Sequence, residues 1–138
     1  MSKSEEKILK FKTGKLSIEE VELVLDNLPV DVTFVDSNDE VKYFNKLEDR
    51  LFKRSPSVIG LKVQNCHPKK SLDKVQQIID EFKAKKRKVA EFWINLNGRM
   101  IYIRYFPIYD SKSDYRGCLE VTQDITDIKE IKGEKRLL

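Results

Sequence analysis

The chain has 138 residues, of which 40% are hydrophobic and 36% charged, and a formal net charge of +4; this length suits one domain with a single core. No apolar run approaches the roughly 20 residues that span a bilayer, and no signal-peptide pattern follows the N-terminus, so the sequence predicts a cytoplasmic protein without membrane contact. Two widely spaced cysteines form neither a disulfide framework nor a zinc pattern, which suits a reducing compartment.

The N-terminal part is expected to hold one flanking helix. Residues 1–15 are polar and rich in lysine, which predicts a flexible lead-in. A capping box at Ser17 and Glu20 then begins a helix over residues 16–28. Its apolar residues recur at helical spacing, which predicts an amphipathic helix. The apolar side of this helix could pack against the outer face of a later hairpin.

Two strands and a second helix follow. Residues 30–36 and 41–44 are β-branched and aromatic and are separated by turn-forming residues, which predicts two paired strands. Asn45 is expected to cap a short helix before Pro56, and Ser71 to cap a long one. The apolar stripe of the long helix consists of Leu72, Val75, Ile78, Ile79 and Phe82.

The remaining residues read as a hairpin and a last strand. Asn97-Gly98 is the strongest two-residue hairpin signal, and closing that turn fixes the register of the two strands. The expected opposite pairs are Leu96 with Arg99, Trp93 with Tyr102, and Glu91 with Arg104. A last strand begins at Cys118, and residues 129–138 form a charged C-terminal tail.

This order of elements predicts an α+β domain with a five-stranded antiparallel sheet and the helices on one face. The basic run at residues 83–88 lacks interleaved aromatic residues. We interpret it as a solvated helix end, where cations suit the negative end of the helix dipole, and expect no nucleic-acid partner.

Three short motifs follow one another along the chain: "VIG" before the long helix, "NG" in the hairpin and "DIT" at the end of the last strand. With these motifs in this order, residues 29–128 resemble a PAS domain. The segments "LPVDVTFVD", "VIGLKVQNCHPKKS", "AEFWINLNGR" and "LEVTQDITDIK" further resemble the C-terminal PAS module of an uncharacterised bacterial and archaeal family, in which it commonly follows a hemerythrin-like domain. That likeness implies that the chain is a module cut out of a longer protein.

The resemblance also implies a function. PAS domains are sensory and interaction modules that bind a small ligand between the sheet and the helices and relay its presence to a partner protein domain. The implied module is non-catalytic, and the helix over residues 16–28 implies a homodimer through that helix. The identity of the ligand and of the partner does not follow.

His67 and Cys66 are the candidates for cofactor or catalytic chemistry. His67 as a haem ligand gives an alternative function, a gas or redox sensor, whereas Pro68 explains the same residue as the junction between two helices. Cys66 lies too far after Gly60 for the photoactive cysteine of flavin-binding PAS domains, so flavin is not expected. A third function is a small enzyme using Cys66, although adjacent residues seldom direct both side chains to one substrate. No metal site other than a haem at His67 is expected.

The last strand is expected to form the pocket wall. In PAS domains the residue two before the aspartate of "DIT", here Thr122, faces the cavity, and alternation turns Glu120 and Cys118 the same way. A buried Glu120 needs a cation, a polar ligand or donors from the protein. Asp124 and Thr126 are expected to bond locally at the strand exit. The expected ligand-binding set is Ile78, Ile79, Phe82, Ile101, Ile103, Tyr105, Cys118, Glu120, Thr122 and, at the pocket edge, His67; a core filled by these side chains is the alternative.

Overall fold

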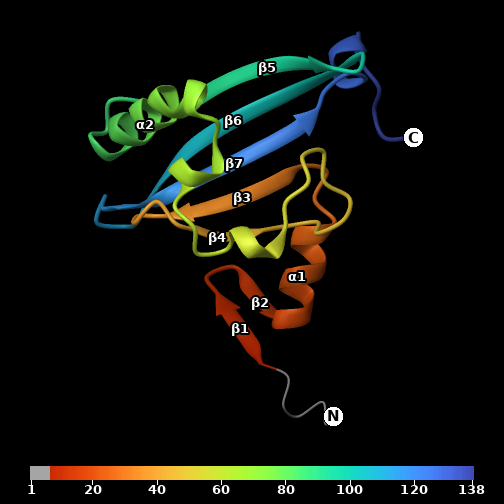
Figure 1. The fold of residues 1–138 in the computed structure, drawn as a ribbon. Helices are drawn as coiled ribbons and strands as arrows, with labels where there is room; N and C mark the ends of the chain where they lie inside the picture. The colour runs from red at the N-terminus through yellow and green to blue at the C-terminus, as the bar shows by residue number, and fades with distance from the viewer. Residues whose placement is uncertain (1–6) are drawn as a thin grey trace.

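The structure is a computed structural model and describes residues 7–138. Strands, helices and short 3-10 helices alternate along the chain (Figure 1). The elements are β1 (Ile8–Phe11), β2 (Gly14–Ser17), α1 (Ile18–Asp26), β3 (Asp31–Asp36), β4 (Val41–Phe44), η2 (Pro56–Val58), η3 (Val63–Cys66), α2 (Lys69–Lys83), β5 (Ala90–Leu96), β6 (Arg99–Tyr109), β7 (Tyr115–Asp124) and η4 (Ile128–Glu130).

The main sheet has five strands in the order β4-β3-β7-β6-β5, and all neighbouring strands are antiparallel. Figure 1 shows α2 and the connection that precedes it on one face of this sheet. The α+β class and the five-stranded antiparallel sheet predicted from the sequence are therefore confirmed.

The hairpin of β5 and β6 has the predicted register. Leu96 lies opposite Arg99, Trp93 opposite Tyr102 and Glu91 opposite Arg104. Asn97 and Gly98 have φ values of 52° and 84°, as a type I′ turn requires. The turn alone therefore determined which face each side chain of both strands occupies.

The core lies between the C-terminal half of α2 and the sheet. Its cluster of buried residues consists of Val35, Val41, Phe82, Ala90 and Cys118. Phe82 is completely buried, and its carbonyl oxygen accepts a 2.5 Å hydrogen bond from the hydroxyl of Tyr109. This bond and the buried ring attach the C-terminal end of α2 to β6.

The N-terminal region departs from the expected lead-in over residues 1–15. Residues 8–17 form a two-stranded hairpin of β1 and β2, in which Lys10 lies opposite Lys15. Residues 1–6 lie outside the described residues. A two-stranded ribbon can be solvated on both faces, so its lysine-rich composition resembled that of an unstructured segment.

Helix α1 begins at the predicted position. The Ser17 side chain accepts from the backbone N–H of Glu20 at 3.0 Å, and the Glu20 carboxylate accepts from the N–H of Ser17 at 2.9 Å, so the capping box is formed. The helix is shorter than residues 16–28. Of its apolar stripe, Ile18 and Val24 are 50% and 52% exposed, and Val21 and Leu25 are half-buried. Figure 1 shows α1 beside β4, at the opposite edge of the sheet from the β5–β6 hairpin, so the outer face of that hairpin does not bury the stripe.

Asn45 does not cap a helix, because residues 45–55 contain none. Its buried side chain instead accepts a hydrogen bond from the N–H of Val32 at 2.7 Å. The same amide donates to the carbonyl oxygens of Leu25 at 2.7 Å and Val30 at 3.2 Å. Asn45 thus links the end of α1 to the start of β3.

Candidate functional site

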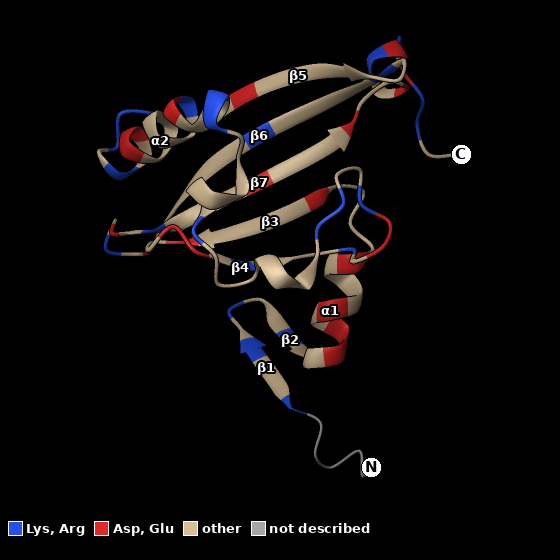
Figure 2. Ribbon diagram, in the orientation of Figure 1, with Lys and Arg blue, Asp and Glu red and all other residues tan. Residues whose placement is uncertain are grey.

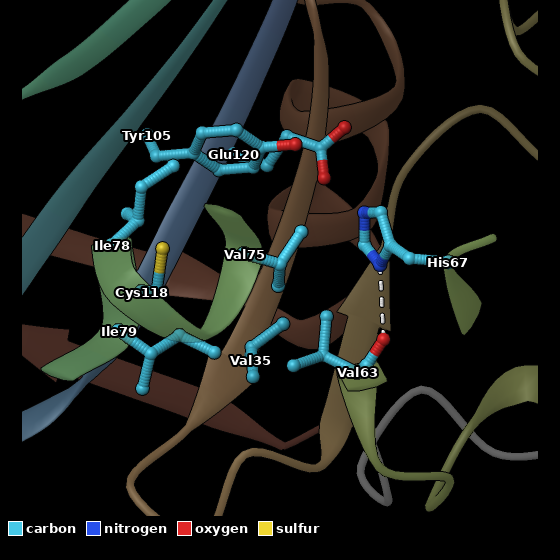
Figure 3. Close-up of a pocket in the computed structure, with 9 residues that line it drawn as sticks. All are labelled: Val35, Val63, His67, Val75, Ile78, Ile79, Tyr105, Cys118 and Glu120. Atoms are coloured by element: carbon cyan, nitrogen blue, oxygen red, sulfur yellow. Dashed lines mark hydrogen bonds between the residues drawn. The ribbon is translucent and has the colours of Figure 1, made fainter. Parts of the chain in front are cut away.

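A small apolar cavity lies between α2, the preceding η3 and the sheet (Figure 3). Its volume is about 30 Å³, above the roughly 10–15 Å³ that a cavity needs to hold one water molecule. The lining residues are Val35, Val63, His67, Val75, Ile78, Ile79, Tyr105, Cys118 and Glu120. Figure 3 shows His67, Tyr105 and Glu120 as its polar members among valine and isoleucine side chains.

Six of the ten expected ligand-binding residues meet at this cavity. They are His67, Ile78, Ile79, Tyr105, Cys118 and Glu120. Four others, Phe82, Ile101, Ile103 and Thr122, are buried but do not line it. Ile103 lies opposite Thr122, on the same sheet face as the cavity but farther along the strands. The three sheet residues miss the cavity because α2 covers only one end of the sheet, which the strand pattern alone did not reveal. Phe82 lies on α2 but packs into the core cluster.

Three lining residues were missing from the expected set. Val75 lies one turn before Ile78 and Ile79 on the apolar stripe of α2, so helical spacing could have identified it. Val35 lies opposite Cys118 in the β3–β7 ladder, a pairing that requires the strand order. Val63 lies on η3, and the sequence carries no clear signal for its position.

The carboxylate of Glu120 has the cation that its burial requires. One guanidinium nitrogen of Arg54, Nη2, lies 3.3 and 3.5 Å from the two carboxylate oxygens, and both side chains are largely buried. Burial and, secondly, the Glu120 carboxylate raise the pKa of Tyr105 above its ordinary value. The same two causes raise the pKa of Cys118 to about 12. The Tyr105 hydroxyl and the Cys118 thiol therefore remain protonated at neutral pH, as groups that can donate a hydrogen bond.

His67 is held at the cavity edge by its own backbone neighbourhood. Its Nδ1 lies 2.9 Å from the carbonyl oxygen of Val63. Because a carbonyl can only accept, Nδ1 carries the proton and Nε2 is the free ring nitrogen. The backbone of His67 is extended, with φ −123° and ψ 147°, and Pro68 follows as the N-cap of α2. The predicted helix junction is therefore present.

Haem does not fit this cavity. A histidine whose Nδ1 is bonded to a carbonyl is oriented as metal-ligating histidines are. However, pockets for ligands of even drug size measure about 300–1,000 Å³, at least about ten times the present volume. The His67 ring therefore has a suitable orientation for a metal, but with α2 in its present position the cavity has no room for a porphyrin.

Cys66 and His67 do not form a nucleophile and base pair. The thiol of Cys66 lies 3.6 Å from the carbonyl oxygen of Lys62, while the ring of His67 is bonded to Val63. The two side chains thus have separate partners. Across residues 7–138, no three His, Cys, Asp or Glu side chains are placed to hold a metal ion together.

A second buried polar group occupies the same sheet face beyond the cavity. The guanidinium of Arg50 donates to the carbonyl oxygens of Val32 at 3.2 Å and Asn45 at 2.8 Å, and to the hydroxyl of Thr33 at 3.3 Å. Burial lowers the pKa of Arg50, and the nearby Asp31 partly offsets that effect. These bonds hold the connection over residues 45–52 on the sheet, a role of Arg50 that no pattern in the sequence indicates.

The strand exit has the expected local bonds. The Asp124 carboxylate accepts from the backbone N–H of Thr126 at 3.0 Å and from its hydroxyl at 2.6 Å. Arg99 also donates to Asp124 at 2.8 Å. The Arg99 and Thr126 hydrogen bonds lower the pKa of Asp124 to about 2.

None of the helices in the described residues is long and apolar enough to cross a membrane.

Comparisons with known proteins agree with this geometry. A family model described as a PAS domain matches residues 21–126. The crystal structure of a C-terminal domain from Streptococcus mutans is 34% identical, with a TM-score of 0.84, over 91% of this chain and 98% of that one. No curated protein matches the chain.

More distant solved structures share the fold alone. The PAS domain of a Colwellia psychrerythraea protein is 18% identical, with a TM-score of 0.57, over 80% of this chain and 98% of that one. A sensory box sensor histidine kinase from Vibrio cholerae is 15% identical, with a TM-score of 0.56, over 77% of this chain and 89% of that one.

Proposed function

The chain belongs to the PAS domain family, and from this premise we propose that it is a non-catalytic cytoplasmic sensory module. A small molecule would bind in the cavity between α2 and the sheet, and its presence would be relayed to a partner domain. The V. cholerae kinase with the same fold is a sensory protein, which supports a sensory role here.

The cavity is the observation that carries this proposal. Its walls are apolar, and three polar side chains, His67, Tyr105 and Glu120, converge on it from separate elements. A concave apolar site with a few placed polar groups is the usual form of a small-molecule site. The free Nε2 of His67 can accept a hydrogen bond from the ligand, and the Tyr105 hydroxyl can donate one.

The small volume suggests how binding would become a signal. About 30 Å³ admits a molecule of very few atoms, so anything larger must displace the helix above it. Such a ligand binds the arrangement with α2 displaced more tightly than the closed one. A difference of this kind is what a ligand needs in order to shift a conformational equilibrium.

Two surfaces could pass the change to other domains. Glu120 lies on β7, which leads through Asp124 and Thr126 to the C-terminal residues. The exposed side chains of α1, Leu23 and Val24, offer an apolar surface to a partner domain. We propose both as relay surfaces of the module.

Ligand-induced stabilisation tests the proposal. Native mass spectrometry of the purified chain identifies any retained molecule, and a panel of small polar and apolar compounds is then screened by thermal shift. We expect at least one compound to raise Tm, because a ligand that binds only the folded state stabilises it. Ile78→Trp, which fills the cavity, should abolish that rise.

Gln77→Trp is the matched control, because Gln77 is exposed on the same helix. It should leave the response unchanged. If no compound stabilises the chain, or if both tryptophan variants respond alike, the cavity is not the ligand site.

A further inference from the structure

The two edge strands of the main sheet differ in whether their outward backbone groups are hydrogen-bonded. Along β4, the first edge strand, the N–H of Val41 donates to the carbonyl oxygen of Leu61 at 3.0 Å, and the N–H of Gly60 donates to that of Val41 at 2.8 Å. A bridge between Glu40 and Lys62 extends this cover. The start of the β4 edge is therefore covered by the chain's own backbone.

The opposite edge, at β5, is open. Among residues 7–138, the seven residues of β5 pair with β6 and with no other strand. Figure 1 shows β5 along the outer edge of the sheet, with no strand beyond it. Phe92, Trp93 and Ile94 are 40%, 62% and 38% exposed, so apolar side chains are accessible on both faces.

The usual protections of an edge strand are missing from β5. Native edges are blunted by lysine, proline, bulges or short length. The segment Ala90–Leu96 has no proline or basic residue, and its register with β6 is unbroken. The only charged residue in β5 is the acidic Glu91. Figure 2 shows red near the start of this strand and no blue along it. Where β6 runs beyond β5, by contrast, Pro107 removes an N–H from the edge.

The register identifies which backbone groups are available. In a two-residue hairpin the residues that flank the turn, here Leu96 and Arg99, exchange both hydrogen bonds, and bonded pairs then alternate along the strands. The N–H and C=O groups of Glu91, Trp93 and Asn95 therefore point away from β6. They form an unused antiparallel template of three residues.

We propose that β5 pairs with β5 of a second copy of this chain, antiparallel and about a two-fold axis at Trp93. This register places Trp93 opposite itself, and it pairs all three outward-facing residues, because Glu91 then lies opposite Asn95 of the second copy. On the other face Phe92 lies opposite Ile94 of the second copy. The two main sheets become one continuous sheet.

Self-complementarity argues for a second copy rather than another partner. The register brings aromatic and β-branched side chains together, which are favourable cross-strand pairs. It places the one charge of the strand, Glu91, opposite a neutral amide and not opposite itself. An isologous contact of this kind also closes after two copies, so the pairing ends in a dimer and not a fibre.

The full chain is tested first by sedimentation and by cross-linking. Sedimentation velocity over a concentration series should show a dimer. In a Cys66→Ser background, Trp93→Cys should form an intermolecular disulfide, because bonded antiparallel pairs have Cα atoms about 5.5 Å apart, within disulfide range. Tyr102→Cys, one strand inward, should not cross-link.

Charge variants separate this edge from other surfaces. Trp93→Lys places two like charges opposite each other and should weaken the dimer about tenfold or more. Gln123→Lys adds the same charge to β7 away from the edge, and Leu23→Lys adds it to α1; neither should change the dimer. Glu91→Pro removes an outward-facing backbone N–H and leaves Trp93 unchanged. It should also weaken the dimer.

Two results overturn the proposal. One is a chain that remains monomeric at about 1 mM, because the Kd of the dimer would then lie above that concentration, too weak for a specific contact. The other is a dimer that Trp93→Lys leaves intact and Leu23→Lys dissociates, which places the contact on α1. Neither result affects ligand binding in the cavity, which the thermal-shift experiment measures separately.

Discussion

At the scale of single residues, the inner face of the sheet is organised by buried charges. The burial of Glu120 predicted that it needs a cation, a polar ligand or donors from the protein, but the sequence did not indicate which of these it has. Arg54 supplies that cation across 66 positions of sequence, because the connection before α2 folds back over β7. The need of a buried carboxylate for a partner follows from that residue alone, whereas the identity of the partner depends on the tertiary fold.

Removing that cation should destabilise the domain. Arg54→Met leaves the Glu120 carboxylate in a largely buried site without a countercharge, and we expect the free energy of unfolding to fall by about 1–3 kcal/mol. Urea unfolding monitored by tryptophan fluorescence measures the loss. Adding Glu120→Gln should recover part of it, because the buried charge is then absent; a double variant less stable than Arg54→Met would contradict the ion-pair interpretation.

Asp124 should give the stability of the domain a defined pH dependence. Its pKa is about 2 in the folded chain and about 3.9 in an unfolded one. Its contribution is therefore fully present above about pH 4 and is lost as pH falls through about 2. Asp124→Asn should be less stable than the wild type at neutral pH, and the difference should shrink between pH 4 and pH 2. Chemical denaturation of both proteins at several pH values measures the difference in their free energies of unfolding. A difference that stays constant from pH 7 to pH 2 would refute this assignment.

At the scale of elements, turn chemistry predicted more than composition did. Asn97-Gly98 fixed the β5–β6 register, whereas the lysine content of residues 8–17 concealed the β1–β2 hairpin. The candidate site was predicted in part for a similar reason. Alternation correctly turned Tyr105 and Glu120 inward, but the position of α2 over one end of the sheet decided which inward residues meet the cavity.

Two glycines should differ sharply in their tolerance of alanine. At Gly117 in β7, φ is 145°, and a Cβ would overlap the carbonyl oxygen of Val35 and approach the Phe34 ring to 2.9 Å. Gly117→Ala should therefore cost about 3 kcal/mol or more. Gly98→Ala meets no atom within 4 Å and should cost only about 1 kcal/mol, from its positive φ. Equal losses of Tm would show that the close approach at β7 is not limiting.

At the scale of the whole molecule, the domain is a sheet with a peripheral N-terminal unit of β1, β2 and α1. Figure 1 shows this unit beside β4, outside the layer formed by α2 and the sheet. None of the residues of α1 is buried, and its attachment includes the Asn45 bond to Leu25 and the bond from the N–H of Lys46 to Asp26. The unit is therefore expected to open before the sheet does.

Hydrogen exchange should reveal that order. Amides of α1 are expected to exchange faster than those of β6 and β7, which lie in the interior of the sheet. Asn45→Ala removes the acceptor of the Val32 N–H and the donor to Leu25, so it should speed exchange in α1 and lower Tm. A variant that lowers Tm while leaving exchange in α1 unchanged would show that Asn45 does not hold the helix.

The attachment of α2 has a mechanical consequence. Its last turn is fixed by the buried ring of Phe82 and by the Tyr109 hydroxyl, whereas its first turn has no side-chain cap and follows an extended proline. We therefore expect a ligand that enters the cavity to displace the first turn of α2, beside His67, farther than its last turn.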